Sequence, residues 1–322
     1  MKCISKFAIP LVMAFCLLLT ACGGKLDRAY DVNSSNPSYT IGAPNKDITA
    51  RAFAEDLCVV SENISGGLDL SLSEASGLFD ISKSTTIVAK NANKVMNPAS
   101  LTKVMTALLA LKYGKLDDTL IASPNVNITE SGAQLLKLSE GDKMTLEEAL
   151  YALLIYSAND VGVLIAEYIS GSVEDFALLM TREAHDLGAT NTNFKNPHGL
   201  TDEEHYTTVY DLYLIFNEAM KYEKFLEIIG CKEHELQYFS AGGQTKTKTI
   251  TNTNSYLNGG TEVPENVIVI GGKTGTTDAA GSCLILLSND INANPYISVV
   301  LNAGDREQLY EQMSRLLKKE AD

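Results

Sequence analysis

Ser100 and Lys103 could do nucleophilic chemistry together, and they form the only Ser-x-x-Lys sequence in the chain. Residues three apart at the start of a helix share one face, so the lysine amine can reach the serine hydroxyl. A serine becomes a good nucleophile when a neighbouring base takes its proton, and a lysine can be that base once burial or a second cation lowers its pKa. Taken alone, the pair is explained at least as well by a helix-capping serine and a solvated lysine one turn later.

Ser157 and Asn159 form a second motif of weaker specificity, because Ser-x-Asn occurs four times in the chain. Only this copy interrupts a long apolar helical stretch, so a polar tripeptide at this point favours a functional role. The alternative is an ordinary turn in which Asp160 caps the following helix.

Lys273, Thr274 and Gly275 come just after the predicted strand 267–271 and make the most specific of the three motifs. A lysine and a threonine hydroxyl on an edge strand can bind a carboxylate. The glycine lets a substrate backbone approach closely. The alternative is a strand that ends in a glycine turn.

Hydrophobic periodicity predicts the elements that position these residues. Helices are expected over 100–113, 145–155, 161–168, 173–187, 209–220 and 308–319. Strands are expected over 57–60, 86–89, 267–270, 283–287 and 296–301, with a weaker one over 77–81 and an inserted loop over 65–76. Because strands at both ends enclose a block of helices, the sequence predicts an α+β fold whose antiparallel sheet is built from both ends of the chain.

Composition excludes some functions. The formal net charge of the 322 residues is −14, which argues against a nucleic-acid partner because that needs a basic surface. Cys58, Cys231 and Cys283 fall in the predicted domain, and neither they nor the four histidines have metal-ligand spacing. The sequence therefore predicts no metal and no cofactor, and leaves open one disulfide with one free thiol.

The N-terminal segment is predicted to be a targeting signal. Residues 1–21 combine a basic start, an apolar core of about a dozen residues and small residues before Cys22. That core is shorter than the ~20 residues that span a bilayer as a helix. We expect a lipoprotein signal over 1–21, a lipidated Cys22 with a flexible tether over 22–49, and one catalytic domain over 50–322. The alternative is a plain signal peptide with an incidental cysteine.

The order of the three motifs resembles that of the low-molecular-weight penicillin-binding proteins, specifically the serine-type D-Ala-D-Ala carboxypeptidases. The likeness extends from about Val59 to the C-terminus. The segments that carry it are 97–107, 157–160, 191–200, 251–254 and 272–281. It implies a β-lactamase/transpeptidase-like fold with a helical subdomain.

The resemblance also implies a role for each motif residue at the reaction centre. Ser100 would attack the carbonyl of the penultimate D-alanine, with Lys103 as general base. Ser157 would relay a proton to the leaving amine. Asn159 would hold a substrate amide and orient Lys103, and Lys273 would add positive potential.

The same resemblance implies how the substrate is held. Thr274 would bind the terminal carboxylate, helped by Arg306, which could otherwise be a surface charge at a helix start. Gly275 would allow close approach of the substrate, and the amides of Ser100 and Thr276 would form the oxyanion hole, where one donor is typically worth ~3 kcal/mol.

Several functions remain open at this point. The expected enzyme trims peptidoglycan pentapeptides, is acylated by β-lactam antibiotics, and is held by its N-terminal lipid at the outer face of the bacterial cell membrane. A D,D-endopeptidase and a non-catalytic penicillin-binding sensor are alternatives. A serine β-lactamase is another, although residues 190–201 lack the acidic residue that class A β-lactamases use.

Overall fold

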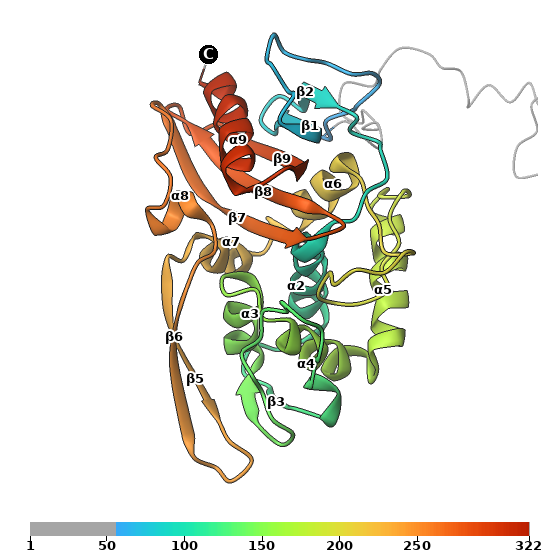
Figure 1. Ribbon diagram of the computed structural model, residues 1–322, viewed down its shortest axis with the longest axis vertical. Helices are drawn as coiled ribbons and strands as arrows, with labels where there is room; N and C mark the ends of the chain where they lie inside the picture. The colour runs from blue at the N-terminus through green and yellow to red at the C-terminus, as the bar shows by residue number, and fades with distance from the viewer. Residues whose placement is uncertain (1–55, 322) are drawn as a thin grey trace, which may run out of the picture. The chain divides into compact units, whose positions relative to one another are not determined.

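The computed structural model describes residues 56–321, which all belong to one compact unit (Figure 1). The predicted signal over 1–21, the lipidated Cys22 and the tether over 22–49 lie outside the described residues. The first residues of the predicted catalytic domain, 50–55, lie outside them too. Among residues 56–321, no helix is long and apolar enough to cross a membrane.

A five-stranded antiparallel sheet is built from both ends of the described chain, as predicted (Figure 1). Its strand order is β2-β1-β9-β8-β7. The strands are β1 (Ser73–Asp80), β2 (Thr85–Lys90), β7 (Val267–Thr277), β8 (Gly281–Asp290) and β9 (Pro295–Ala303). The N-terminal hairpin β1–β2 therefore lies beside the C-terminal strand β9, and β7 forms the edge opposite β2.

Both faces of this sheet are covered. Helix α9 (Arg306–Glu320) packs on one face, and the helical part of the chain packs on the other (Figure 1). Along β8, Leu284 and Leu286 belong to the hydrophobic cluster with α9, whereas Ile285 and Leu287 belong to the cluster with the other helices. Burial on both faces explains why β8 reads as a continuous apolar run and not as an alternating pattern.

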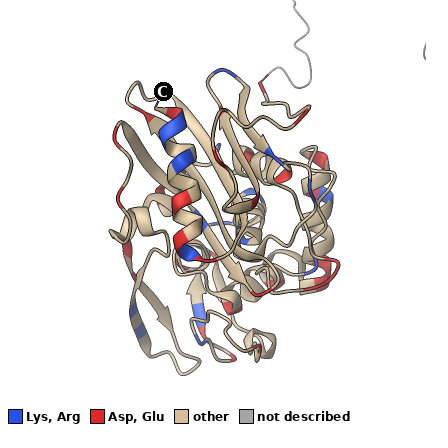
Figure 2. Ribbon diagram, turned by 45° about the horizontal axis from the view of Figure 1, so that its top comes forward, with Lys and Arg blue, Asp and Glu red and all other residues tan. Residues whose placement is uncertain are grey.

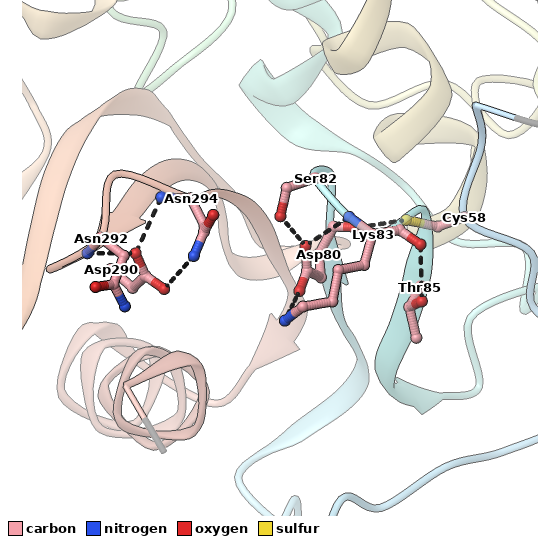
Figure 3. A network of polar contacts seen from close by, with 8 residues as sticks. All are labelled: Cys58, Asp80, Ser82, Lys83, Thr85, Asp290, Asn292 and Asn294. Atoms are coloured by element: carbon pink, nitrogen blue, oxygen red, sulfur yellow. Dashed lines mark hydrogen bonds and ion pairs between the residues drawn. The ribbon is translucent and has the colours of Figure 1, made fainter.

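Two aspartates close the tight turns of this sheet (Figure 3). Asp80 ends β1 and accepts hydrogen bonds from the Ser82 hydroxyl and from the Lys83 amide and ammonium groups. Asp290 ends β8 and accepts from the amides of Asn292 and Asn294. An aspartate that bonds the backbone two or more residues ahead mimics a backbone turn.

The helical part contains six helices among the described residues: α2 (Thr102–Tyr113), α3 (Leu146–Leu154), α4 (Asn159–Ser170), α5 (Val173–Asp186), α6 (Val209–Ala219) and α7 (Glu223–Gly230). Side-chain caps fix where three of these helices begin. The side chains of Thr145, Ser172 and Thr208 each accept a hydrogen bond from the backbone amide three residues further along. Residues 102–110 of α2 are all buried, because other helices and the sheet surround it.

Sequence reasoning missed a second sheet of four strands, in the order β3-β4-β5-β6. Its strands are β3 (Thr119–Ile121), β4 (Lys143–Thr145), β5 (Glu233–Phe239) and β6 (Thr245–Thr251). Short helical segments complete the described structure: η2 (Ala99–Leu101), η3 (Pro124–Val126) and α8 (Ser255–Asn258).

Two sequence predictions near the N-terminal edge were wrong. Residues 57–60 form no strand, because side chains take the place of a neighbouring strand: the Cys58 amide donates to the Tyr213 hydroxyl, and the Tyr210 hydroxyl donates to the Cys58 carbonyl. The region 65–76 is not wholly an inserted loop, because β1 begins at Ser73. Ser73 and Ser76 are buried and bond each other, so this end of the strand lacks an apolar signal.

Candidate active site

Ser100 lies in the short helix η2 immediately before α2, and a distorted backbone presents it. Ala99, just before it, has a φ of 47°, in the left-handed region that costs a non-glycine residue about 1–2 kcal/mol. The Thr102 hydroxyl donates to the Ala99 carbonyl and accepts from Nε2 of the buried His205. Because the Lys195 amide donates to Nδ1 of His205, that ring is neutral, and burial lowers its pKa to about 4.

Lys103 is fully buried one helical turn after Ser100, and its Nζ has three oxygen neighbours. The side-chain carbonyl of Asn159 and the backbone carbonyl of His198 each lie 2.6 Å away, and the Ser100 hydroxyl lies 2.8 Å away. A neutral amine has two hydrogens and one lone pair. The two carbonyls can only accept, so they take the hydrogens and leave the lone pair directed at Ser100.

The electrostatic surroundings favour this neutral form of Lys103. Burial lowers the Lys103 pKa well below its usual value, and the positive charge of Lys273 lowers it further. The nearby Asp160 acts in the opposite direction, with a smaller effect. A lysine in such a site can accept a proton near neutral pH.

Ser157 and Lys273 form a second pair beside the first. Lys273 Nζ donates to the Ser157 hydroxyl over 3.0 Å and to the Thr274 carbonyl over 2.8 Å, and burial lowers the Lys273 pKa to about 7. Ser157 lies between α3 and α4 with a φ of 67°. This left-handed residue ends one buried helical segment and lets Asn159 begin the next.

The edge strand β7 brings the third motif to the nucleophile. A Cβ built on Gly275 would lie 2.9 Å from the Ser100 amide nitrogen, so only glycine allows this close approach without a shift. Thr274 and Thr276 flank Gly275 on the strand and line the cavity in front of it. The Thr274 hydroxyl also bonds the Thr253 hydroxyl at 2.6 Å.

Arg306 is the first residue of α9 and reaches across to the start of α8. It donates to the Thr253 carbonyl and to the Ser255 hydroxyl, and it lies over the ring of Tyr310. These contacts fix the guanidinium at the wall of the cavity that Thr274 lines.

A cavity of about 710 Å³ unites the predicted site residues. Ser100, Ser157, Asn159, Thr274, Gly275, Thr276 and Arg306 line it, and Lys103 and Lys273 lie buried against its serines. The one predicted residue that the structure does not place is Cys22, which lies outside the described residues. Within residues 56–321, no cluster of histidine, cysteine or acidic side chains could hold a metal ion.

Sequence reasoning missed some residues of this site. The loop residues Glu130–Gln134 line the cavity, and the Gln134 carbonyl accepts from the Asn159 amide, but no motif marked them. Thr253 lies in a segment noted for its resemblance and received no role. His198 contributes a backbone carbonyl, which no side-chain pattern could reveal.

Comparison with known proteins agrees with this geometry. The family model for D-alanyl-D-alanine carboxypeptidases matches residues 72–305. The chain belongs to this family.

Curated relatives include two proteins named D-alanyl-D-alanine carboxypeptidase. DacF of Bacillus subtilis is 35% identical over 71% of this chain and 57% of its own length. DacC of Escherichia coli is 30% identical over 74% of this chain and 59% of its own length. The chain therefore spans somewhat more than half the length of these relatives.

A solved structure, the Streptomyces DD-transpeptidase, has the same fold. It superposes with a TM-score of 0.71 over 81% of this chain and 99% of its own, at 24% sequence identity. The fold is thus the penicillin-binding, β-lactamase-like one that the resemblance implied.

Proposed function

We propose that this chain is a serine-type D-alanyl-D-alanine carboxypeptidase that removes the terminal D-alanine from peptidoglycan stem peptides. The observation that carries the proposal is the 2.8 Å contact between the Ser100 hydroxyl and Nζ of the buried Lys103. The two other oxygens beside this nitrogen are carbonyls, which only accept hydrogen bonds, so its lone pair is available to Ser100. Membership of the carboxypeptidase family supports the substrate class.

In the first step, Lys103 takes the proton of Ser100 as its oxygen attacks the carbonyl of the penultimate D-alanine. The amides of Ser100 and Thr276 stabilise the oxyanion. Gly275 allows the substrate carbonyl to reach this position, because its missing side chain keeps β7 close to Ser100.

Collapse of the oxyanion breaks the amide bond, and the leaving amine of D-alanine needs a proton. Ser157 relays to this amine the proton that Lys103 took from Ser100, which leaves Lys103 neutral again, and the hydrogen bond from Lys273 holds the Ser157 hydroxyl in place. Water then attacks the acyl-enzyme while Lys103 accepts its proton. Lys103 returns that proton to the departing Ser100 oxygen, which releases the shortened peptide and restores the enzyme. Asn159 holds Lys103 in place and binds a substrate amide.

The terminal carboxylate of the substrate binds at the far end of the cavity. Thr274 donates a hydroxyl hydrogen bond there, and Lys273 and Arg306 supply positive charge. Because Arg306 bonds Thr253 and Ser255, its position is set before the substrate arrives. β-Lactam antibiotics, which carry a carboxylate beside a reactive amide, are proposed to acylate the same serine.

Other functions within the fold have less support. The cavity lining contains Glu130 and Asp278 but no acidic residue from 190–201, where a class A β-lactamase has its second base. A non-catalytic sensor would not need two buried lysines, which are costly to keep in a fold.

We also propose that Cys22 is lipidated after removal of residues 1–21 and holds the enzyme at the outer face of the cell membrane, with 22–49 as a tether and 50–322 as the catalytic domain. Fatty-acid labelling of the full chain expressed in bacteria tests this anchor. Wild type should take up label and fractionate with membranes, whereas Cys22→Ala should do neither. Label retained by Cys22→Ala would contradict the proposal.

A direct test of the activity is D-alanine release from a pentapeptide that ends in D-Ala-D-Ala. The wild-type chain should release one D-alanine per peptide, and Ser100→Ala should release none above background. Release that persists in Ser100→Ala would overturn the proposed mechanism.

Gly199→Ala is expected to slow this reaction about 100-fold, because a displacement of ~1 Å at the reaction centre can cost that much. Gly199 has a φ of 85°, and a Cβ on it would lie 1.9 Å from the Ala99 carbonyl oxygen, so the backbone before Ser100 must move. Gly171→Ala is the matched control, since Gly171 has a φ of 82° and open space around it. Equal rates in the two variants would show that the Ala99 contact does not matter.

A further inference from the structure

Asp160 is a buried carboxylate beside the reaction centre, and the proposed reaction gives it no task. Charged residues commonly lie at the protein surface, as several acidic and basic positions along α9 do (Figure 2). Asp160 is instead 1% exposed, in the first turn of α4 and directly after Asn159. Because taking a charge out of water is costly, a buried carboxylate needs compensating partners.

The partners of Asp160 come mainly from a loop that lies 22 to 24 positions earlier in the chain. Its Oδ1 accepts from the Leu136 amide over 3.0 Å, and its Oδ2 accepts from the Lys137 and Leu138 amides over 2.8 and 3.0 Å. Within α4 it accepts from the adjacent Val161 amide over 3.1 Å. Asp160 therefore ties this loop to the start of α4.

The loop tied in this way is part of the active site. Its residues 130–134 line the cavity, and the Gln134 carbonyl accepts from the Asn159 amide over 2.8 Å. Lys137 has a φ of 69°, a conformation that a non-glycine residue keeps only where its surroundings impose it. The hydrogen bond from the Lys137 amide to Asp160 is one such constraint.

These ties reach the base through Asn159. The side-chain carbonyl of Asn159 lies 2.6 Å from Lys103 Nζ and takes one of its hydrogens, which directs the lone pair at Ser100. A shift of Asn159 would turn the amine away from the nucleophile. Charge acts on the same amine: burial and the Lys273 cation lower the Lys103 pKa, and the negative charge of Asp160 raises it.

Two further titratable groups lie near Lys103 in the described part of the chain, His198 and His205. Burial lowers their pKa values to about 3 and about 4, so neither gains a charge near neutral pH.

We propose that Asp160 is a positioning residue for the reaction: it ties the loop 134–138 to α4, and through Asn159 it holds Lys103 in line with Ser100. The inference rests on the proposed function, in which Lys103 is the base. Asp160 does not line the cavity, so it acts through its neighbours and not on the substrate.

Asp160→Asn tests this role, because it keeps the shape of the side chain but replaces one acceptor oxygen by an NH2 group. Single-turnover acylation of the full-length chain by benzylpenicillin should slow about tenfold at the pH optimum, a part of what a ~1 Å displacement at a reaction centre can cost. With the negative charge gone the Lys103 pKa falls, so the acid limb of the acylation profile should move to lower pH. An aspartate that only stabilises the fold would not move that limb.

Two further variants separate the tie from the charge. Lys137→Pro removes one loop donor and cannot keep a φ of 69°, because proline fixes φ near −65°. It retains Asp160, so acylation should slow while the acid limb stays in place. Asp142→Asn is the matched control, since Asp142 is 2% exposed and accepts from the Ser139 amide of the same loop but pairs with Lys246. It should keep the rate within twofold and the profile unchanged.

Circular dichroism establishes which variants are folded. A folded Asp160→Asn chain that acylates at the wild-type rate, or slows without a shift of the acid limb, would overturn the inference, as would an equal shift in Asp142→Asn. If Asp160→Asn does not fold, wild-type acylation by Lys137→Pro would contradict the tie. Because acylation does not require D-alanine release, a wild-type chain that acylates but releases no D-alanine would overturn the carboxypeptidase assignment alone.

Discussion

Lys103→Met is expected to lower kcat/KM for D-alanine release by roughly 10³- to 10⁴-fold, within the range that a general base contributes. Methionine fills much of the same buried space but has no lone pair that can take the Ser100 proton. The two carbonyls that hold the amine, from Asn159 and His198, would then lose their donor. Single-turnover acylation by benzylpenicillin measures the effect on the chemical step directly.

Lys112→Met provides the matched control for Lys103→Met. Lys112 lies on the same helix α2, but it is partly exposed and paired with Glu183 outside the site. Its replacement should leave acylation within twofold of wild type. Circular dichroism of both variants checks that α2 remains folded. A Lys103→Met protein that is folded and acylates at the wild-type rate would show that another group is the base.

Lys273→Met is expected to move the acid limb of the kcat/KM profile to higher pH. The cation at Lys273 lowers the Lys103 pKa, so its removal raises that pKa. Lys103 is then protonated, and inactive as a base, up to a higher pH. The rate at its maximum should also fall by about 10²- to 10³-fold, because a buried donor near the substrate carboxylate and Ser157 is lost.

The alkaline side of the same profile gives a second readout. In wild type, carboxylate binding should weaken as pH rises through the Lys273 pKa of about 7, which appears as a rising KM. In Lys273→Met that dependence should vanish. Lys248→Met removes one charge from β6, where the lysine bonds Tyr156, and should keep the wild-type profile. An acid limb that stays in place or moves to lower pH in Lys273→Met would contradict the coupling between the two lysines.

The five-stranded sheet could be predicted because its central strands are buried on both faces and read as apolar runs. The sheet β3–β6 could not, since polar residues occupy most exposed positions of β5 and β6, and β6 reads Thr-Lys-Thr-Lys-Thr-Ile-Thr. The prediction of a strand over 57–60 was wrong for the opposite reason. It is apolar, yet Val59 is 61% exposed and tyrosine hydroxyls satisfy the backbone of Cys58.

The part of the site that could be predicted consists of the side chains that lie within short sequence motifs. Ser100 and Lys103 are three residues apart, so local helix geometry alone brings them together. The backbone groups that complete the site come from distant segments: the His198 carbonyl lies 95 positions from Lys103, and Gly275 meets Ser100 through the sheet edge. Such partners depend on tertiary packing, which no local pattern encodes.

Two residues of the site also run against local preference. Ala99 and Ser157 both have positive φ, at a cost of about 1–3 kcal/mol each, and neither residue type signals that conformation. Strain of this kind concentrates where function needs a fixed geometry. Ala99 places Ser100 against Gly275, and Ser157 turns the chain between α3 and α4 so that its hydroxyl meets Lys273.

The most direct test of the account is mass spectrometry of the intact chain after incubation with benzylpenicillin, followed by peptide mapping. We predict one covalent adduct per chain, located on Ser100, stable for minutes or longer, and absent from Ser100→Ala. An adduct on any other residue, or no adduct on a folded wild-type chain, would contradict the assignment of Ser100 as the nucleophile.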